Sequence, residues 1–120
     1  MAVKIREVVQ AVEGELLTAP EGLERTVETA CGSDLMSDVL AFVKEKTVLI
    51  TGLINPHVMR TAEMLDIVCV IFSRGKRPSE EMLDMARETG TVIVATEMTT
   101  YTACGELYLR GLPGTKGKMQ

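Results

Sequence analysis

The sequence is poor in aromatic residues. Its 120 residues contain no Trp, and Phe, Tyr and Trp together make up only 3%. The core must therefore be aliphatic, and the eight Met residues fill part of it because Met packs adaptably. Few rings are available to stack on bases, and the net charge of −4 disfavours contact with a phosphate backbone. We therefore expect no nucleic-acid partner.

The sequence also lacks the spacing of a zinc site or a disulfide framework. There is one histidine, and Cys31, Cys69 and Cys104 are far apart with no CxxC pair. An odd number of separated cysteines is typical of free thiols in a reducing compartment. Asp34 and Asp38 could share a metal, but no third ligand is in view, so we expect them to cap a helix and to be solvated. The sequence predicts no metal and no cofactor.

Long apolar runs are absent as well. No run reaches the ~18–20 residues that a membrane-spanning helix needs. Residues 1–10 have the pattern of an amphipathic helix rather than that of a secretory signal. We therefore expect a cytoplasmic protein with no membrane partner. The length is that of one domain.

Three short apolar runs dominate the second half of the chain. They are Thr47–Gly52, Ile67–Gly75 and Thr91–Thr96, and each is too continuous for a half-exposed strand. Such runs are typical of strands buried on both faces of a parallel sheet. Because helical patterns fill the gaps between them, the sequence predicts a single α/β domain. It has a mainly parallel sheet of about four to five strands with flanking helices.

Capping residues, turns and periodicity place the remaining elements. Strands are expected at Glu15–Thr18 and Arg25–Cys31. Helices are expected at the following places: Val3–Glu13, Leu35–Lys44 with Ser33 or Asp34 as its cap, Asn55-Pro56 to Leu65, Pro78 to Gly90, and Thr99 or Thr100 to about Arg110. We expect the domain to span residues 3–110 and residues 111–120 to form a flexible tail.

In open parallel sheets, ligands bind beyond the carboxyl ends of the strands, near a switch in strand order. That rule gathers four loops that hold hydroxyls, glycines, free helix-start N–H groups and three cations, which together suit an anion such as a phosphate. The candidate ligand-binding residues are Ser33, Asp34, Thr51, Gly52, Asn55, Ser73, Arg74, Gly75, Lys76, Arg77, Thr99 and Thr100.

The loop 73–77 is the sharpest single candidate, because it carries three cations in an acidic chain. It satisfies no nucleotide-binding motif. The alternative is a solvated turn whose cations lie near Glu80, Glu81 and Asp84. Cys31 precedes a helix start, where a thiol pKa can fall, but without a complete nucleophile motif we expect it to pack in the structure. No catalytic residue is assigned.

Several short segments follow one another as they do in a known family. They are Gly14-Glu15-Leu16-Leu17, Leu23-Glu24-Arg25-Thr26-Val27, Ser33-Asp34-Leu35-Met36-Ser37-Asp38-Val39, Val48–Thr51, Asn55-Pro56, Ile71–Pro78, and Thr99–Tyr101 with Gly105. On these segments the chain resembles the DRTGG domain family from Val3 to about Leu109. The family's Asp-Arg corresponds to Glu24-Arg25, and its Thr-Gly-Gly to Ser73-Arg74-Gly75, where one Gly is lost and a cation is gained.

Members of this family accompany CBS domains in regulated pyrophosphatases and phosphotransacetylase-like proteins, and the fold is similar to the N-terminal domain of HPr kinase/phosphorylase. There the module is regulatory or dimer-forming and not catalytic. The resemblance implies an α/β domain that self-associates, with an adenine nucleotide or phosphate as the candidate ligand. Because no CBS or catalytic segment is attached here, we expect it to act on a separate partner.

Three functions follow. The leading hypothesis is a non-enzymatic regulatory module, a homodimer that senses a small anionic ligand. A dimer is plausible because few helices are available to cover the sheet edges and the Met-bearing faces. The alternative is a structural adaptor that docks on a partner enzyme without a small-molecule ligand. An enzyme that acts on a phosphorylated substrate is the third, and it lacks a base and nucleophile pair.

Overall fold

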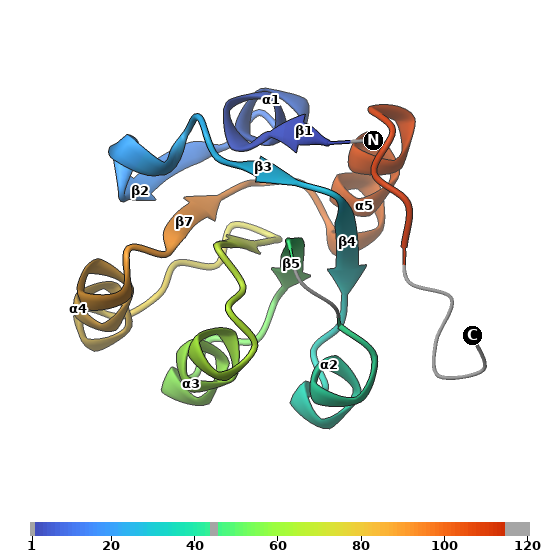
Figure 1. Cartoon of the computed structure of the whole chain (residues 1–120). Coiled ribbons are helices and arrows are strands. Elements are labelled where there is room, and N and C mark those ends of the chain that lie inside the picture. The colour runs from blue at the N-terminus through green and yellow to red at the C-terminus, as the bar shows by residue number, and fades with distance from the viewer. Residues whose placement is uncertain (1, 44–45, 115–120) are drawn as a thin grey trace.

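The computed structural model describes residues 2–43 and 46–114. A central five-stranded sheet has helices on both faces (Figure 1). The strands of this sheet are β2 (Glu15–Thr18), β4 (Thr29–Gly32), β5 (Thr47–Thr51), β6 (Cys69–Phe72) and β7 (Val92–Ala95). A second, two-stranded sheet pairs β1 (Val3–Lys4) with β3 (Thr26–Val27). The predicted α/β fold with a mainly parallel sheet is confirmed.

The strand order of the main sheet is β2-β7-β6-β5-β4. Neighbours from β4 to β7 are parallel, and β2 pairs antiparallel with β7 at one edge. The parallel strands therefore follow one another in sequence order without a reversal, so this part of the sheet has no switch point. The expectation that the candidate site lies near such a switch was wrong on this point. The expectation that the loops lie beyond the carboxyl ends of the strands still holds, because all four parallel strands end at one edge of the sheet.

The helices form the two outer layers. They are α1 (Ile5–Ala11), α2 (Met36–Phe42), α3 (Pro56–Met64), α4 (Glu80–Thr89) and α5 (Thr100–Leu109). Figure 1 shows α2, α3 and α4 on one face of the sheet, and α1 and α5 on the other. Right-handed crossovers between parallel strands that advance in one direction place their helices on one face, which explains the position of α2, α3 and α4.

Each face of the sheet has its own aliphatic core. Side chains of β5 alternate between the two: Ile50 packs with α1 and α5, whereas Leu49 packs with α2 and α3. All of β5, β6 and β7 is buried, as the continuous apolar runs predict. Both cores of this domain are built mainly of Val, Ile, Leu and Met, without tryptophan.

Helix starts follow their local sequence. The Asn55 side chain accepts a hydrogen bond from His57 N at 2.8 Å, and Pro56 occupies the first position of α3. Ser79 and Thr99 cap α4 and α5 in the same way. Gly90 ends α4 with φ = 75°, a conformation that suits glycine.

Two local predictions were wrong. The single strand expected over 25–31 is two strands, because Val27 pairs with Val3 in the small sheet whereas Thr29 pairs with Thr47 in the large one. The helix expected from Leu35 begins at Met36, and neither Ser33 nor Asp34 caps it: the N-cap residue is Leu35, without a side-chain bond.

The end of the described chain packs on the domain. Leu112 is buried, and the carbonyl of Pro113 accepts a hydrogen bond from Ala30 N at 3.1 Å. Residues 111–114 therefore differ from the flexible tail expected for 111–120, and residues 115–120 lie outside the described residues. Within the described ranges, no helix has the length and hydropathy to cross a bilayer.

Candidate functional site

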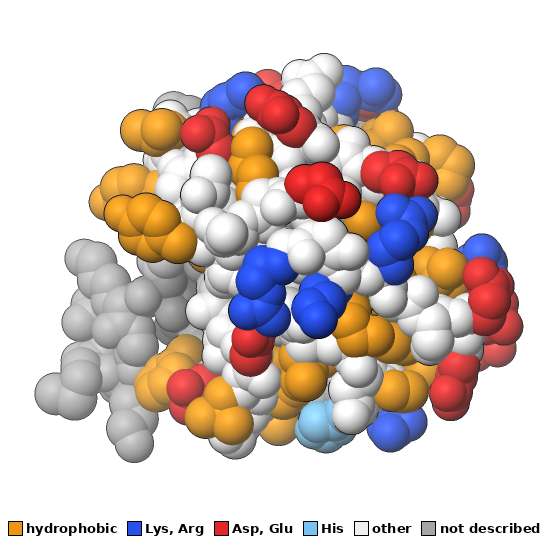
Figure 2. Space-filling model, turned by 180° about the vertical axis from the view of Figure 1, so that it is seen from behind, with side chains coloured by type: hydrophobic (Ala, Val, Ile, Leu, Met, Phe, Trp, Pro, Cys, Tyr) orange, Lys and Arg blue, Asp and Glu red, His pale blue; other side chains and the backbone are white. Residues whose placement is uncertain are grey.

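The four candidate loops meet where the parallel strands end, at what we call the carboxyl edge. Backbone bonds of 3.0 Å tie successive loops to the neighbouring strands: Ser33 N donates to Ile50 O, and Ser73 N donates to Thr51 O. Figure 2 shows this edge from outside, with basic side chains near its centre and acidic side chains around them. The loops that the sequence rule grouped therefore lie side by side in the structure.

Asp34 links two of these loops. Its Oδ1 accepts hydrogen bonds from Gly52 N at 2.8 Å and from Thr51 Oγ1 at 2.9 Å. Thr51 is fully buried, and its hydroxyl also accepts from Leu53 N at 3.1 Å. The backbone N–H of Gly52 is the main cause that holds the pKa of Asp34 below its ordinary value of 3.8. Burial opposes it, and the Thr51 hydroxyl and the Arg74 charge add to the lowering of this pKa. Asp34 is thus an ionised acceptor that joins β5 to the start of α2.

Arg74 comes to the same point from the loop after β6. Arg74 and Gly75 both have positive φ, 59° and 70°, and Lys76 N bonds to Ser73 O at 3.1 Å, which is the geometry of a tight two-residue turn. The Arg74 guanidinium lies over Gly52, where a Cβ would collide with it, and its Nη2 is 3.9 Å from Asp34 Oδ2. Gly52 is therefore required for this approach.

Arg77 belongs to the same loop as Arg74 but contacts the edge strand β2. It donates to both carboxylate oxygens of Glu15 on β2, at 2.9 and 3.3 Å, and this contact lowers the pKa of Glu15. A cavity of about 220 Å³ adjoins this pair and is lined by Glu13, Glu97 and Gly75 as well. The solvated-turn alternative expects the cations of the loop near Glu80, Glu81 and Asp84. Arg77 instead contacts Glu15 on β2, and Arg74 contacts the Asp34 loop.

The remaining candidates support the loops. Ser73 Oγ and Thr100 Oγ1 are 2.6 Å apart and tie β6 to α5. Ser33 Oγ accepts from Leu35 N at 3.0 Å within its own turn. Asn55 and Thr99 cap helices. The structure therefore brings four of the twelve candidates into one cluster, namely Asp34, Thr51, Gly52 and Arg74.

The thiols do not form a reactive site. Burial raises the pKa of Cys31 and Cys104, and raises that of Cys69 to about 12. The expectation that Cys31 packs in the structure agrees with this, because the side chain is partly buried against the core. Cys31 packs against the α2 and α3 core and Cys104 against the α1 and α5 core, so the sheet separates them. Within 2–43 and 46–114, no three His, Cys, Asp or Glu side chains form a metal cluster.

The sequence reasoning missed the outer face of α5. Tyr101, Tyr108 and Leu109 are 88%, 70% and 80% exposed. They border a shallow apolar cavity of about 570 Å³, and Gly105 lies at its centre with open space beyond its Cα. The signal was present, because α5 carries apolar residues all round, and such a helix is normally buried on every side. We call Tyr101, Gly105, Tyr108 and Leu109 the α5 outer face.

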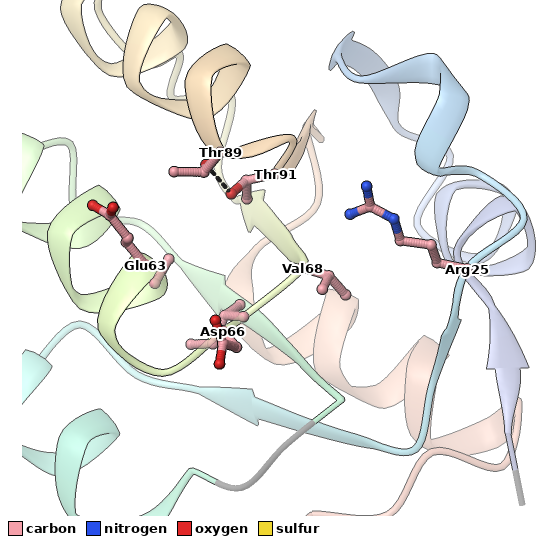
Figure 3. Close-up of a pocket in the computed structure, with 8 residues that line it drawn as sticks. Arg25, Glu63, Asp66, Val68, Thr89 and Thr91 are labelled. Atoms are coloured by element: carbon pink, nitrogen blue, oxygen red, sulfur yellow. Dashed lines mark hydrogen bonds between the residues drawn. The ribbon is translucent and has the colours of Figure 1, made fainter.

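The two segments compared with the family's name-giving residues lie at opposite ends of the sheet. Ser73-Arg74-Gly75 follows β6, whereas Arg25 lines a cavity with Val68, which precedes β6 (Figure 3). Glu24 is paired with Lys4 and Arg6, which lowers the pKa of its carboxyl. The two segments therefore cannot act in one site.

Comparison with known proteins bears on the whole domain. The sequence model of the DRTGG domain matches residues 7–108. No curated protein matches the sequence. A similar solved structure is that of the CBS and DRTGG domains of the regulatory region of Clostridium perfringens pyrophosphatase, complexed with its activator, diadenosine tetraphosphate. It is 16% identical with a TM-score of 0.72, over 96% of this chain and 51% of that one. This chain thus spans about half the length of that regulatory region, and the likeness shows the fold.

Proposed function

This chain belongs to the DRTGG domain family, and from that premise we propose that it is a non-enzymatic regulatory module. It forms a homodimer, and it responds to a small phosphate-bearing ligand, such as an adenine nucleotide, at the carboxyl edge of its sheet. The similar pyrophosphatase region is complexed with a nucleotide activator, which supports this class of ligand.

The observation that carries the proposal is the placement of Arg74 over Gly52 and beside Asp34. A cation, a backbone N–H and a buried hydroxyl all face the Asp34 carboxylate, which are the groups that bind phosphate elsewhere. The Asp34 carboxylate therefore occupies the position that a ligand anion would take, and a phosphate that approaches Arg74 competes with this carboxylate. Because α2 begins directly after Asp34 and Leu35, release of this carboxylate gives ligand binding a way to alter the start of α2.

A regulatory role is supported by how the hydroxyls are used. Thr51 donates to Asp34, Ser73 pairs with Thr100, and Thr96 donates to Val12 O at 2.7 Å. These bonds hold loops together. A catalytic hydroxyl needs a base within hydrogen-bond reach. Of these three hydroxyls only Thr51 bonds to a carboxylate, and the lowered pKa of Asp34 makes that carboxylate a weak base.

The α5 outer face supports the dimer. Two copies of α5 that cross antiparallel at Gly105 would place Tyr101 of each protomer beside Leu109 of the other, with both glycines at the point of closest approach. Such an arrangement is self-complementary, as a two-fold interface requires. A glycine inside a helix costs about 1 kcal/mol relative to alanine, and close approach of a second helix would account for it.

Thermal-shift measurements test the ligand. Phosphate, acetyl phosphate, AMP, ADP, ATP and diadenosine tetraphosphate are added to the wild type and to Arg74→Gln, with Arg87→Gln on α4 as the matched control. Arg87 is paired with Asp84 away from the edge. A ligand at a hundred times its Kd stabilises by about 2.7 kcal/mol. The proposal requires a shift that is lost only in Arg74→Gln, and a shift unchanged in that variant would contradict the site.

The exposed α5 outer face also favours the second candidate, an adaptor that docks on a partner enzyme through this surface. Sedimentation analysis separates the two. A dimer at micromolar concentration that Tyr108→Glu dissociates supports self-association. A monomeric wild type that gives no ligand shift would favour the adaptor.

A further inference from the structure

A second cavity lies at the amino edge of the sheet, where the parallel strands begin. It has a volume of about 310 Å³ and is lined by Arg25, Glu63, Asp66, Thr89 and Thr91, with Ala62, Ile67 and Val68 as its apolar wall. An adjoining hollow shares Arg25, Asp66 and Val68 with it. We call the first of these the Arg25 cavity. It is separate from the candidate site at the carboxyl edge.

The Arg25 side chain is held in place by its surroundings. Its Nη1 donates to Gly90 O at 3.0 Å. The guanidinium packs between two glycines: a Cβ at Gly22 would lie 3.6 Å from Cζ, and one at Gly90 would lie 3.4 Å from Nη2. The backbone is fixed too, since Ile5 N donates to Arg25 O at 2.9 Å. The guanidinium is thus positioned without a side-chain partner.

Among the described residues, no carboxylate lies within ion-pair distance of Arg25. One of its five N–H groups is used by Gly90, so at least two remain for a planar acceptor such as a carboxylate. Lys46, which lines the adjoining hollow, is already 3.7 Å from Glu28. Arg25 is therefore the cation of this cavity that can take an anionic group.

The opposite wall carries the opposite charge. Figure 3 shows Asp66 across the cavity from Arg25, whereas the carboxylate of Glu63 points away from Arg25. Asp66 stands at φ = 54° in the turn after α3, with its N–H bonded to Glu63 O. Neither carboxylate has a side-chain partner within the described ranges. A carboxylate and a guanidinium on opposite sides of one cavity suit a molecule that carries both charges better than a plain anion such as phosphate.

We propose that the Arg25 cavity binds a small zwitterion with an apolar side chain, that is, an α-amino acid of the leucine or valine type. Its carboxylate pairs with Arg25, its ammonium group lies toward Asp66, and its side chain contacts Val68, Ile67 and Ala62. The hydroxyls of Thr89 and Thr91, 2.7 Å apart, also line this cavity. The site is thereby selective for molecules that carry both charges.

Calorimetric titration of the full chain with leucine, isocaproate and isoamylamine tests the two charges separately. Isocaproate lacks the ammonium group of leucine, and isoamylamine lacks its carboxylate. We expect leucine to bind and each single-charge analogue to bind at least tenfold more weakly. Equal binding of isocaproate and leucine would overturn the proposal, and so would the absence of heat from every amino acid at millimolar concentration.

Two variants locate the site. Arg25→Gln and Asp66→Asn should each weaken leucine binding at least tenfold, whereas Arg87→Gln should leave it unchanged. Asp66→Asn keeps Arg25 and its bond to Gly90, so it remains informative if Arg25→Gln does not fold. Both variants should keep the response to phosphate compounds that is expected at Arg74. Unchanged leucine binding in Asp66→Asn would overturn the proposal for the Arg25 cavity, whereas loss of the phosphate response in Asp66→Asn would contradict the carboxyl-edge site.

Discussion

The two edges of the sheet treat their charged groups differently. At the carboxyl edge, Asp34 accepts from Gly52 and Thr51 and faces Arg74, so charges and loops are mutually bonded. At the amino edge, Arg25 and Asp66 face one another across a cavity without an ion pair. At the carboxyl edge, a ligand must compete with hydrogen bonds that the protein already makes. At the amino edge, a ligand can pair with the charged groups without breaking a bond.

This difference has a physical consequence. An anion at the carboxyl edge must displace an internal acceptor, so binding and conformational change are coupled there. A ligand in the Arg25 cavity adds contacts to groups that are already in place, so binding there needs little rearrangement. Under the two proposals made above, a conformational response is expected at the first edge and binding without rearrangement at the second, and the predictions below test this difference.

The largest expected effect is on stability at the carboxyl edge. Thr51→Val removes a fully buried hydroxyl that serves both Asp34 and Leu53 N. Since one N–H loses its acceptor, the free energy of unfolding should fall by about 2 kcal/mol. The same change at the exposed Thr26 of the amino edge should alter it by less than about 0.5 kcal/mol. Urea unfolding measures both, and similar losses would remove the contrast between the edges.

The next effect concerns competition with Asp34. Asp34→Asn keeps an acceptor for Gly52 N but removes the charge that opposes an incoming phosphate. We expect phosphate compounds to bind about tenfold more tightly than to the wild type, which is about 1.4 kcal/mol. Titration calorimetry checks this, with Glu97→Gln near Gly75 as the comparison. Weaker binding to Asp34→Asn would mean that Asp34 is a ligand contact and not a competitor.

A smaller effect is expected on α5. In the single protomer, a Cβ at Gly105 meets no atom within 4 Å, so Gly105→Ala should stabilise the monomer by about 1 kcal/mol through helix propensity. If two α5 helices cross at this glycine, the same change must weaken dimerisation. Sedimentation equilibrium alongside thermal unfolding separates the two contributions. Undiminished self-association in this variant would place the interface elsewhere.

Much of this molecule could be predicted from its sequence, and what was missed has a common cause. The strands at 47–51 and 92–95 can be predicted because both of their faces are buried, which gives continuous apolar runs. Asn55-Pro56 predicts a helix start from local chemistry alone. That Asp34 lies near Gly52 follows from the parallel topology. That Asp34 bonds to Gly52 N, and not to the first N–H groups of α2, does not follow from it. Asp34 has the residue type and position of a cap, and only the approach of β5 offers it a better donor than α2 does.

The missed features depend on tertiary placement. The sequence predicted Arg25 at the start of a strand, but the position of its side chain depends on Gly22 and Gly90, and Asp66 lines the same cavity from another segment. The exposure of Tyr108 could not be inferred from sequence because an apolar helix is ordinarily covered on all sides. Sequence reasoning thus located the loops of the carboxyl edge but not the amino-edge cavity.

The smallest expected effect is the pH dependence of the carboxyl edge. The pKa of Asp34 is lower in the folded state than its ordinary 3.8, so its contribution to stability is present above that value and is lost as pH falls through the folded pKa. Glu15 and Glu24 act in the same direction, so the wild type alone does not isolate Asp34. The informative quantity is the difference in Tm between the wild type and Asp34→Asn, measured from about pH 6 to about pH 3. It should be largest near neutral pH and should shrink toward acid, by a modest amount because Asp34 is half exposed and solvent screens its interactions. A difference that stays constant over this range would mean that the bonds to Gly52 and Thr51 do not depend on the charge of Asp34, and that a phosphate has no charged competitor at this edge.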